Sequence, residues 1–225
     1  MKINIKNFYC IEALIESNPE IIEFINIPNP KDKKISELTV NATQYGIKIL
    51  NKSKDFYAAC KEPAVRDIKS ANYEIGKSVL IFDEVQDTRN LGSCLRTASF
   101  FGINSVIIPK NNSADFNNTA VIETSTGGVY DLDLYKVANI SQTINKLKEN
   151  NYWVTGFSEH AKKDINTLVP SEKNVFVFGN EQKGIKQLVL KNCDEVLKIK
   201  QIGQTSSLNI SIAAAIATYT LTNKI

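Results

Sequence analysis

Three polar stretches of this chain hold the groups that could bind a ligand and move a proton. Residues 83–98 contain Arg96, residues 179–185 contain Glu181, and residues 204–215 pass from polar loop into helix near Ser207. An arginine binds anions such as phosphate, a glutamate accepts protons, and the free N–H groups of a first helical turn donate to ligands. Such chemistry requires that the three stretches come together in the fold.

The helix after the first stretch leaves Arg96 outside the core. Leu91, Leu95 and Ala98 recur at three- and four-residue spacing and form the buried stripe. At 3.6 residues per turn, Arg96 lies about 140° around the helix from Leu91. Arg96 is therefore free to face a ligand; a solvent-exposed structural arginine is the alternative.

The second stretch has a glycine near each end, Gly179 and Gly184, around Glu181. This spacing suits a tight turn whose backbone approaches a ligand closely. Ile185 follows Gly184 where a P-loop needs Lys and then Ser or Thr, and the chain has no G-x-G-x-x-G pattern. Phosphoryl transfer and nicotinamide chemistry thus lack their main sequence signals.

The third stretch predicts a helix that begins near Ser207, with Ser206 or Ser207 as its N-cap. The free N–H groups of the first turn would face the loop, where a ligand could use them. An ordinary capped core helix is the alternative. Three- and four-residue spacing predicts one apolar face, made of Leu208, Ile212, Ala215, Ile216 and Tyr219.

Strands alternating with helices must position these stretches. We predict strands over 79–82, 105–108, 152–157, 174–178 and 195–199, and helices over 91–101, 117–123, 141–149 and 185–192. The first and fourth strands are nearly continuous apolar runs, which is typical of a parallel sheet covered on both faces. Ligands bind outside the carboxyl ends of such strands, and the unusual stretches lie there.

Residues 1–66 predict a smaller α/β unit, followed by a linker at 67–77 and the larger unit at 78–225. We expect helix 9–16, strand 21–27, helix 35–45, strand 47–50 and a helical segment at 55–59. Lysines near both ends of the second helix could contact RNA or simply be solvated. They are Lys31, Lys33, Lys34, Lys48, Lys52 and Lys54.

The composition limits the classes of protein to which this chain can belong. The 225 residues, 43% apolar and 23% charged, are typical of a folded globular chain, and the net charge of +3 neither proves nor excludes a nucleic-acid partner. We expect a cytoplasmic protein without a membrane span or signal peptide. Four dispersed cysteines and a single histidine, His160, indicate buried thiols and disfavour a metal site or a Ser-His-Asp triad.

The three stretches together resemble the three signature motifs of the SpoU (TrmH-like) RNA 2′-O-ribose methyltransferases. The matching segments are Asn90-Leu-Gly92 with Arg96, Phe178 through Gly184, and Ile199 through Asn209, in the order and spacing of the family. The resemblance covers residues 78–225. Residues 1–66 look like the N-terminal RNA-binding domain of members that modify a guanosine of large-subunit ribosomal RNA.

The resemblance implies a parallel α/β sheet whose C-terminal segment threads a deep trefoil knot, and it implies a homodimer. It also implies S-adenosylmethionine as the cofactor and no metal. The cofactor residues would be Gly179, Ile199 and Leu208, with Ser207 and Asn209 shaping the loop. The catalytic residues would be Arg96 and Glu181 beside the reacting ribose, Asn90 as organiser of the first loop, and again Ser207 and Asn209.

The implied reaction passes a methyl group to a ribose 2′-hydroxyl, so the protein must orient that hydroxyl and help remove its proton. A guanidinium has a pKa above about 12, and deprotonating it near pH 7 would cost roughly 7 kcal/mol. We therefore expect Arg96 to bind the neighbouring phosphate and stabilise the developing alkoxide. The proton would leave late, or through Glu181, Ser207 or water.

Departures from the family pattern leave alternatives open. Ile199-Lys200-Gln201 stands where the family usually has Ile-Pro-Met, which predicts a changed affinity for the cofactor. Tyr9-Cys10 and residues 61–65 depart from the usual N-terminal pattern, which leaves the choice of RNA substrate open. Transfer RNA is an alternative substrate. A catalytically silent RNA-binding relative is another alternative, and an unrelated α/β enzyme with Glu181 and Asp83 as an acid/base pair is the last.

Overall fold

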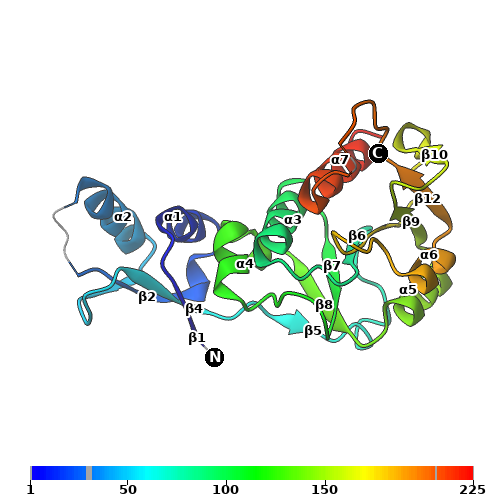
Figure 1. Ribbon diagram of the computed structural model, residues 1–225. Coiled ribbons are helices and arrows are strands. Elements are labelled where there is room, and N and C mark those ends of the chain that lie inside the picture. Colours follow the sequence, from blue (N-terminus) through cyan, green and yellow to red (C-terminus); the bar gives the residue numbers. More distant parts are fainter. Residues whose placement is uncertain (1, 29–31, 206, 225) are drawn as a thin grey trace.

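Two β-sheets organise the chain, and the computed structural model describes residues 2–28, 32–205 and 207–224 of it (Figure 1). A four-stranded sheet lies in the N-terminal part, and an eight-stranded sheet carries the rest. The larger sheet is the one from which the polar stretches emerge.

The smaller sheet has the strand order β1-β4-β2-β3. Its strands are β1 (Lys2–Ile5), β2 (Ile22–Asn26), β3 (Lys48–Leu50) and β4 (Tyr57–Lys61). Its helices are α1 (Phe8–Ser17), the 3-10 turn η1 (Pro19–Ile21) and α2 (Lys33–Gln44). The side chains of Asn7 and Asp32 cap α1 and α2 by accepting first-turn N–H groups. The predicted strands 21–27 and 47–50 and helices 9–16 and 35–45 are confirmed.

One prediction in this part is wrong, because residues 55–59 are not helical. They enter β4, which lies between β1 and β2 and pairs antiparallel with both. Ala58, Ala59 and Cys60 are buried there. Alanines favour a helix locally, but hydrogen bonds to a strand on each side decide the conformation.

The larger sheet has the order β10-β12-β9-β11-β6-β7-β8-β5, and the strand pairs found in it are parallel. Its strands are β5 (Val65–Arg66), β6 (Ser78–Phe82), β7 (Ser105–Pro109), β8 (Asp133–Val137), β9 (Trp153–Phe157), β10 (Lys163–Asp164), β11 (Asn174–Phe178) and β12 (Glu195–Lys198). The five predicted strands are confirmed. β8 and the two-residue strands β5 and β10 were not predicted.

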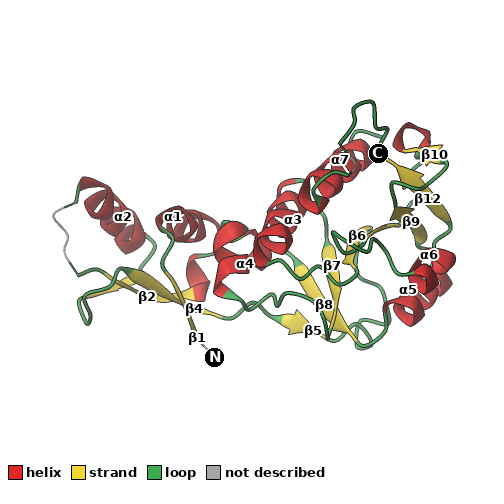
Figure 2. Ribbon diagram, in the orientation of Figure 1, coloured by secondary structure: helices red, strands yellow, loops and turns green. Residues whose placement is uncertain are grey.

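Helices cover both faces of the larger sheet (Figure 2). One face carries α3 (Thr88–Phe100), α4 (Thr119–Thr124), the 3-10 turn η2 (Gly128–Asp131) and α7 (Ile210–Thr222). The other carries α5 (Ile140–Glu149) and α6 (Gln187–Asn192), and the 3-10 turn η3 (Ile165–Thr167) follows β10. Successive side chains of β6 point to opposite faces of the sheet. Leu80 and Phe82 belong to the hydrophobic core on one face, and Val79 and Ile81 belong to the core on the other. A parallel sheet covered on both faces was the predicted fold class.

The start and the buried face of α7 differ from the prediction. α7 begins at Ile210 and is capped by Asn209 rather than by Ser207; Ser206, the other predicted cap, lies outside the described residues. Ile212 and Tyr219 are 51% and 58% exposed, whereas Ala214 is among the buried residues. α7 is apolar on most sides, so periodicity does not decide which face is buried. Its buried residues are Ile210, Ala214, Ala217, Thr218 and Leu221, and the helix packs on α3.

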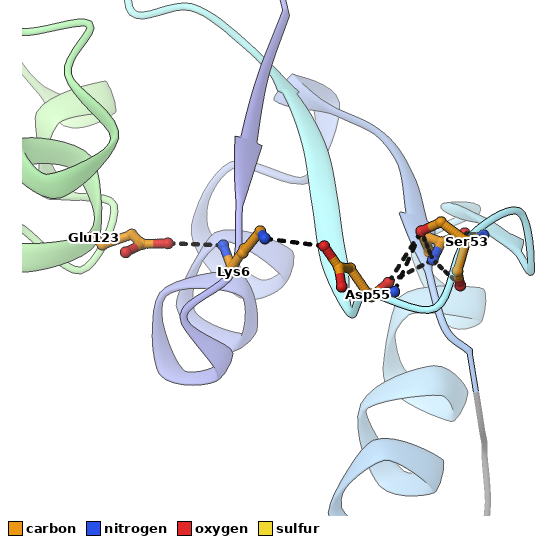
Figure 3. A network of polar contacts seen from close by, with 5 residues as sticks. Lys6, Ser53, Asp55 and Glu123 are labelled. Atoms are coloured by element: carbon orange, nitrogen blue, oxygen red, sulfur yellow. Dashed lines mark hydrogen bonds and ion pairs between the residues drawn. The ribbon is translucent and has the colours of Figure 1, made fainter.

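The N-terminal part is fixed to the larger sheet through α4. Oε1 of Glu123 accepts the backbone N–H groups of Lys6 and Asn7, at 2.7 and 3.0 Å, just before α1 begins. Figure 3 shows the bond to Lys6. The Lys6 ammonium reaches Asp55 at 3.1 Å. Apolar packing continues across the junction, because Leu14 of α1 lies against Gly127 in the turn after α4. The two parts therefore share one continuous core.

Replacing Gly127 by alanine should destabilise this junction. Gly127 has φ 83°, and an added Cβ would lie 2.5 Å from Cδ2 of Leu14, whose side chain is fully buried. We expect Gly127→Ala to lower the free energy of unfolding by about 2–4 kcal/mol, because left-handed strain and overpacking add.

Gly102→Ala is the matched control, since Gly102 has φ 67° but nothing within 4 Å of an added Cβ. It should lower the free energy of unfolding by only about 1 kcal/mol. Urea denaturation measures both variants, and equal losses would contradict the tight contact with Leu14.

Candidate active site

The three polar stretches meet at one edge of the larger sheet. β6 lies beside β11, and β9 lies between β11 and β12, all of them parallel. Their carboxyl ends therefore share an edge, and the loops that leave it lead to α3, to a turn at residues 179–184 and to α7. This is the edge at which ligands bind in open parallel sheets.

A chain of side-chain hydrogen bonds joins the three loops. Nδ2 of Asn90 donates to Oε1 of Glu181 at 2.9 Å, and Oδ1 of Asn90 accepts from Nδ2 of Asn209, also at 2.9 Å. Oδ1 of Asn209 in turn accepts from the backbone N–H and the hydroxyl of Ser211. We call Glu181, Asn90, Asn209 and Ser211 the Asn90 network. It links segments that are far apart in the sequence.

The turn that carries Glu181 is closed by its own backbone. Asn180 and Gly184 exchange two backbone hydrogen bonds of 3.1 and 2.8 Å. Oδ1 of Asn180 also accepts the N–H groups of Gln182 and Lys183. A Cβ on Gly179 would overlap the backbone of Gly184 and Ile185, so only glycine fits. Glu181 is thereby held on a rigid turn.

Glu84 ties this turn to the loops after β6 and β7. Its carbonyl accepts from Nδ2 of Asn180 at 2.9 Å, and its carboxylate accepts from Lys186 at 2.7 Å and Asn112 at 3.0 Å. The hydrogen bonds from Lys186 and then Asn112 lower the pKa of Glu84 from its usual value. Glu84 has φ 62°, which is uncommon for a residue with a side chain. Its partners stabilise that conformation.

A cavity of about 1200 Å³ lies beside the Asn90 network. Phe157 lines it and is stacked on the buried Phe178, with ring centroids 5.0 Å apart and planes within 7°. Ile199 and Leu208 add apolar surface, and polar residues of the turn at 179–184 and of the loop after β12 complete the lining. Ligand cavities usually measure about 300–1,000 Å³, so this one admits a molecule of nucleotide size.

Most of the site residues predicted from sequence lie around this cavity. Gly179, Ile199, Ser207, Leu208 and Glu181 line it. Their roles in binding and catalysis stay predictions.

The remaining three lie outside the lining. Asn90 and Asn209 reach its edge through their hydrogen bonds in the Asn90 network. Arg96 is exposed on α3, as predicted, and makes no hydrogen bond or ion pair with another residue that the structure describes. Its guanidinium is therefore available to a ligand.

The sequence analysis did not single out Phe157, Asn180 or Glu84. Phe157 and Phe178 each end a strand, β9 and β11 respectively, and this shared position could have signalled their stacked pair. The roles of Asn180 and Glu84 depend on contacts between loops, which no local pattern encodes.

Asp83 has a structural position. It is 2% exposed, its backbone N–H donates to the carbonyl of Phe178, and its carboxylate accepts the backbone N–H of Lys186. Burial raises the pKa of Asp83, while the N–H and the charge of Lys186 oppose that rise. Asp83 does not line the cavity. An acid/base pair of Glu181 with Asp83 therefore loses its support.

Burial disfavours the thiolate form of all four cysteines. Burial raises the pKa of Cys10, Cys60 and Cys193 to about 12, and it also raises the pKa of the fully buried Cys94. Within the described ranges no group of three His, Cys, Asp or Glu side chains could hold a metal ion. In that same part of the chain, no helix has the length and apolar character needed to cross a membrane.

Comparison with known proteins assigns the family. Residues 77–219 match the model of the SpoU rRNA Methylase family. The chain belongs to this family.

Two relatives match this SpoU family chain along nearly its whole length. One, from Staphylococcus aureus (strain MSSA476), is named as a TrmH family tRNA/rRNA methyltransferase; it is 33% identical over 231 residues, covering 95% of this chain and 92% of the relative. The other, from Archaeoglobus fulgidus, is named as a tRNA/rRNA methyltransferase; it is 33% identical over 223 residues, covering 95% of each chain.

Solved structures share the fold. The SpoU methyltransferase AviRb from Streptomyces viridochromogenes, crystallised with its cofactor AdoMet, has a TM-score of 0.80 at 18% identity, over 99% of this chain and 90% of AviRb. An RNA 2′-O ribose methyltransferase has a TM-score of 0.79 at 18% identity, over 99% of this chain and 88% of the other. The α/β fold with a parallel sheet is thus that of SpoU methyltransferases.

The left-handed backbone of Glu84 gives a prediction about stability. Glu84→Ala loses the contacts with Lys186 and Asn112 and keeps the strain, so the free energy of unfolding should fall by about 1–2 kcal/mol. Glu84→Gly loses the same contacts but relieves the strain, so it should stay within about 0.5 kcal/mol of the parent. Urea denaturation of both variants is the measurement; equal stabilities would show that the backbone conformation is not strained.

Proposed function

We propose that this chain transfers a methyl group from S-adenosylmethionine to a ribose 2′-hydroxyl of RNA, with a guanosine of 23S ribosomal RNA as the target. The observation that carries the proposal is that the cavity lined by Gly179, Ile199 and Leu208 lies against the Asn90 network, which holds Glu181. Membership of the SpoU family supports the reaction class. The similarity to AdoMet-bound AviRb supports the choice of cofactor.

The cavity suits S-adenosylmethionine in size and chemistry. Phe157 and Leu208 would offer an apolar surface for an adenine ring, and the polar loop residues would meet a ribose and an amino-acid end. Gly179, Ile199 and Leu208 would hold the cofactor, with Ser207 and Asn209 shaping the loop. When bound, it supplies a methyl group on a positively charged sulfur.

Arg96 and Glu181 would act on the ribose. Arg96 presents a fork of N–H donors that can bind the neighbouring phosphate through two parallel bonds. Because a guanidinium stays protonated near pH 7, Arg96 stabilises the developing alkoxide and does not take its proton. Glu181, oriented by Asn90, accepts that proton, or Ser207 or water does so.

The RNA would be held by the N-terminal part as well. Residues 1–66 would bind the RNA, and the junction at Glu123 keeps them at a fixed distance from the cavity. A cytoplasmic enzyme would meet such RNA, and the required 2′-hydroxyl excludes DNA at the reaction site. Transfer RNA is the alternative target, because the names of both relatives cover tRNA and rRNA. A silent RNA-binding relative would have no need of the Asn90 network.

We also propose a homodimer. Phe100, Ile212 and Tyr219 are 81%, 51% and 58% exposed on α3 and α7, and the ring of Tyr219 contacts Phe101. A second copy of the chain would cover such an apolar face. Light scattering of the purified protein tests this, and the mass of one chain would contradict it.

We propose in addition that the C-terminal segment is knotted. The loop after β12 lines the same cavity as the turn at 179–184, and α7 then packs on α3. That path supports a segment threaded through the preceding loops, a rare topology.

Methyl transfer to RNA tests the proposed function. The purified protein is incubated with S-adenosylmethionine that carries a radioactive methyl group and with unmodified ribosomal or transfer RNA. Ribose positions that resist alkaline hydrolysis are then mapped. One resistant position in large-subunit RNA supports the proposal, and one in transfer RNA selects the alternative target. Cofactor binding without transfer to either RNA would favour the silent relative.

Substitution of Arg96 separates its proposed role from cofactor binding. Arg96→Ala should lower kcat about 100- to 1,000-fold, because a preorganised donor to the developing alkoxide is lost, while the affinity for S-adenosylmethionine stays the same. Arg96→Lys keeps the charge but loses the fork, so it should restore only part of the rate. Full activity of Arg96→Lys with unchanged RNA affinity would show that the assigned role is wrong.

A further inference from the structure

The loop between β12 and α7 forms one wall of the cavity. Ile199 and Lys200 through Gly203 line it, as does Thr205, whereas Gln204 does not. The side chain of Ile202 is 91% exposed. This part of the lining is thus little covered by the rest of the chain.

The loop has almost no hydrogen bonds of its own. Nε2 of Gln201 donates to the carbonyl of Gly203 at 2.9 Å and to the carbonyl of Thr205 at 2.8 Å. Among the described residues, residues 200–205 make no other hydrogen bond. The turn at 179–184, which forms the facing part of the lining, is in contrast closed by two backbone hydrogen bonds.

We propose that Gln201 is a positioning residue, whose side-chain amide holds residues 201–205 in the shape that the cofactor meets. A primary amide nitrogen carries two N–H groups, and here both are used on carbonyls two and four residues ahead. In an ordinary turn backbone N–H groups would donate to such carbonyls, whereas here the side chain of Gln201 donates to them. This inference rests on the proposed binding of S-adenosylmethionine in the cavity.

The hydrogen bonds of Gln201 fix the shape of the loop before the ligand binds. A loop that already has its bound shape loses less conformational freedom on binding, and affinity rises accordingly. Gln201 therefore governs the affinity for the cofactor through the loop.

Two variants and one matched control test the role of Gln201. Gln201→Glu keeps the shape of the side chain but replaces the two N–H donors by a carboxylate that repels both carbonyls. Gln201→Ala removes the side chain. Gln204→Ala is the control, because Gln204 is also an exposed glutamine of this loop, but it neither lines the cavity nor makes a hydrogen bond with a described residue.

Two measurements are made on the complete chain. Calorimetric titration with S-adenosylmethionine gives Kd, which should rise about tenfold for Gln201→Glu and less for Gln201→Ala, while Gln204→Ala matches the parent. The order parameters of the backbone N–H groups at 200–205 are measured by NMR relaxation without ligand. They should be lower in both Gln201 variants than in the parent and the control.

The outcomes separate this inference from the function on which it rests. An unchanged Kd in the Gln201 variants overturns the inference, and so does a raised Kd with unchanged order parameters, because Gln201 would then contact the ligand without shaping the loop. Lower order parameters together with a raised Kd support it. Failure of the parent protein to bind S-adenosylmethionine would instead overturn the proposed function.

Discussion

The amide of Asn90 is the interaction on which the rest of the site depends. A primary amide both donates and accepts, so Asn90 can bind the carboxylate of Glu181 on one side and the amide of Asn209 on the other. A carboxylate or an ammonium group in its place would lose one of these bonds. Each partner is also placed by its own local structure: Asp87 caps the helix that carries Asn90, the turn of Glu181 is closed by its backbone, and Asn209 caps α7.

The parts of the molecule around Asn90 are held by different numbers of hydrogen bonds. Glu84 holds the turn at 179–184 through Asn180 and Lys186, and the N-terminal part is anchored to α4 by Glu123. The loop at 200–205 is different, because Gln201 alone supplies its hydrogen bonds to described residues. The turn that carries Glu181 and the loop at 200–205 are thus held in two different ways, one by its backbone and the other by a single side chain.

The sequence predicts the strands and helices better than it predicts the contacts between distant segments. Apolar runs such as 79–82 and 174–178 identify buried parallel strands, because burial on both faces leaves no alternation. Residues 55–59 were predicted as helical, since local propensity cannot register the pairing of β4 with two neighbours. The face of α7 was predicted from its periodicity, but the helix is apolar on most sides, and Ile212 and Tyr219 are exposed while Ala214 and Ala217 are buried. The cavity gathers Gly179, Ile199 and Leu208 as the motifs suggested. The contributions of Phe157 and Glu84 follow from tertiary contacts, which no single motif contains.

A double-mutant cycle on Asn90 and Asn209 tests most directly the claim that one hydrogen-bonded chain holds the site together. The kcat/KM for methyl transfer to RNA is measured for the parent, Asn90→Ala, Asn209→Ala and the double variant. Our account predicts that Asn90→Ala causes most of the loss and that Asn209→Ala adds little to it, with a coupling free energy of about 0.5–3 kcal/mol. Losses that simply multiply would show that the two residues act independently, and would contradict the account.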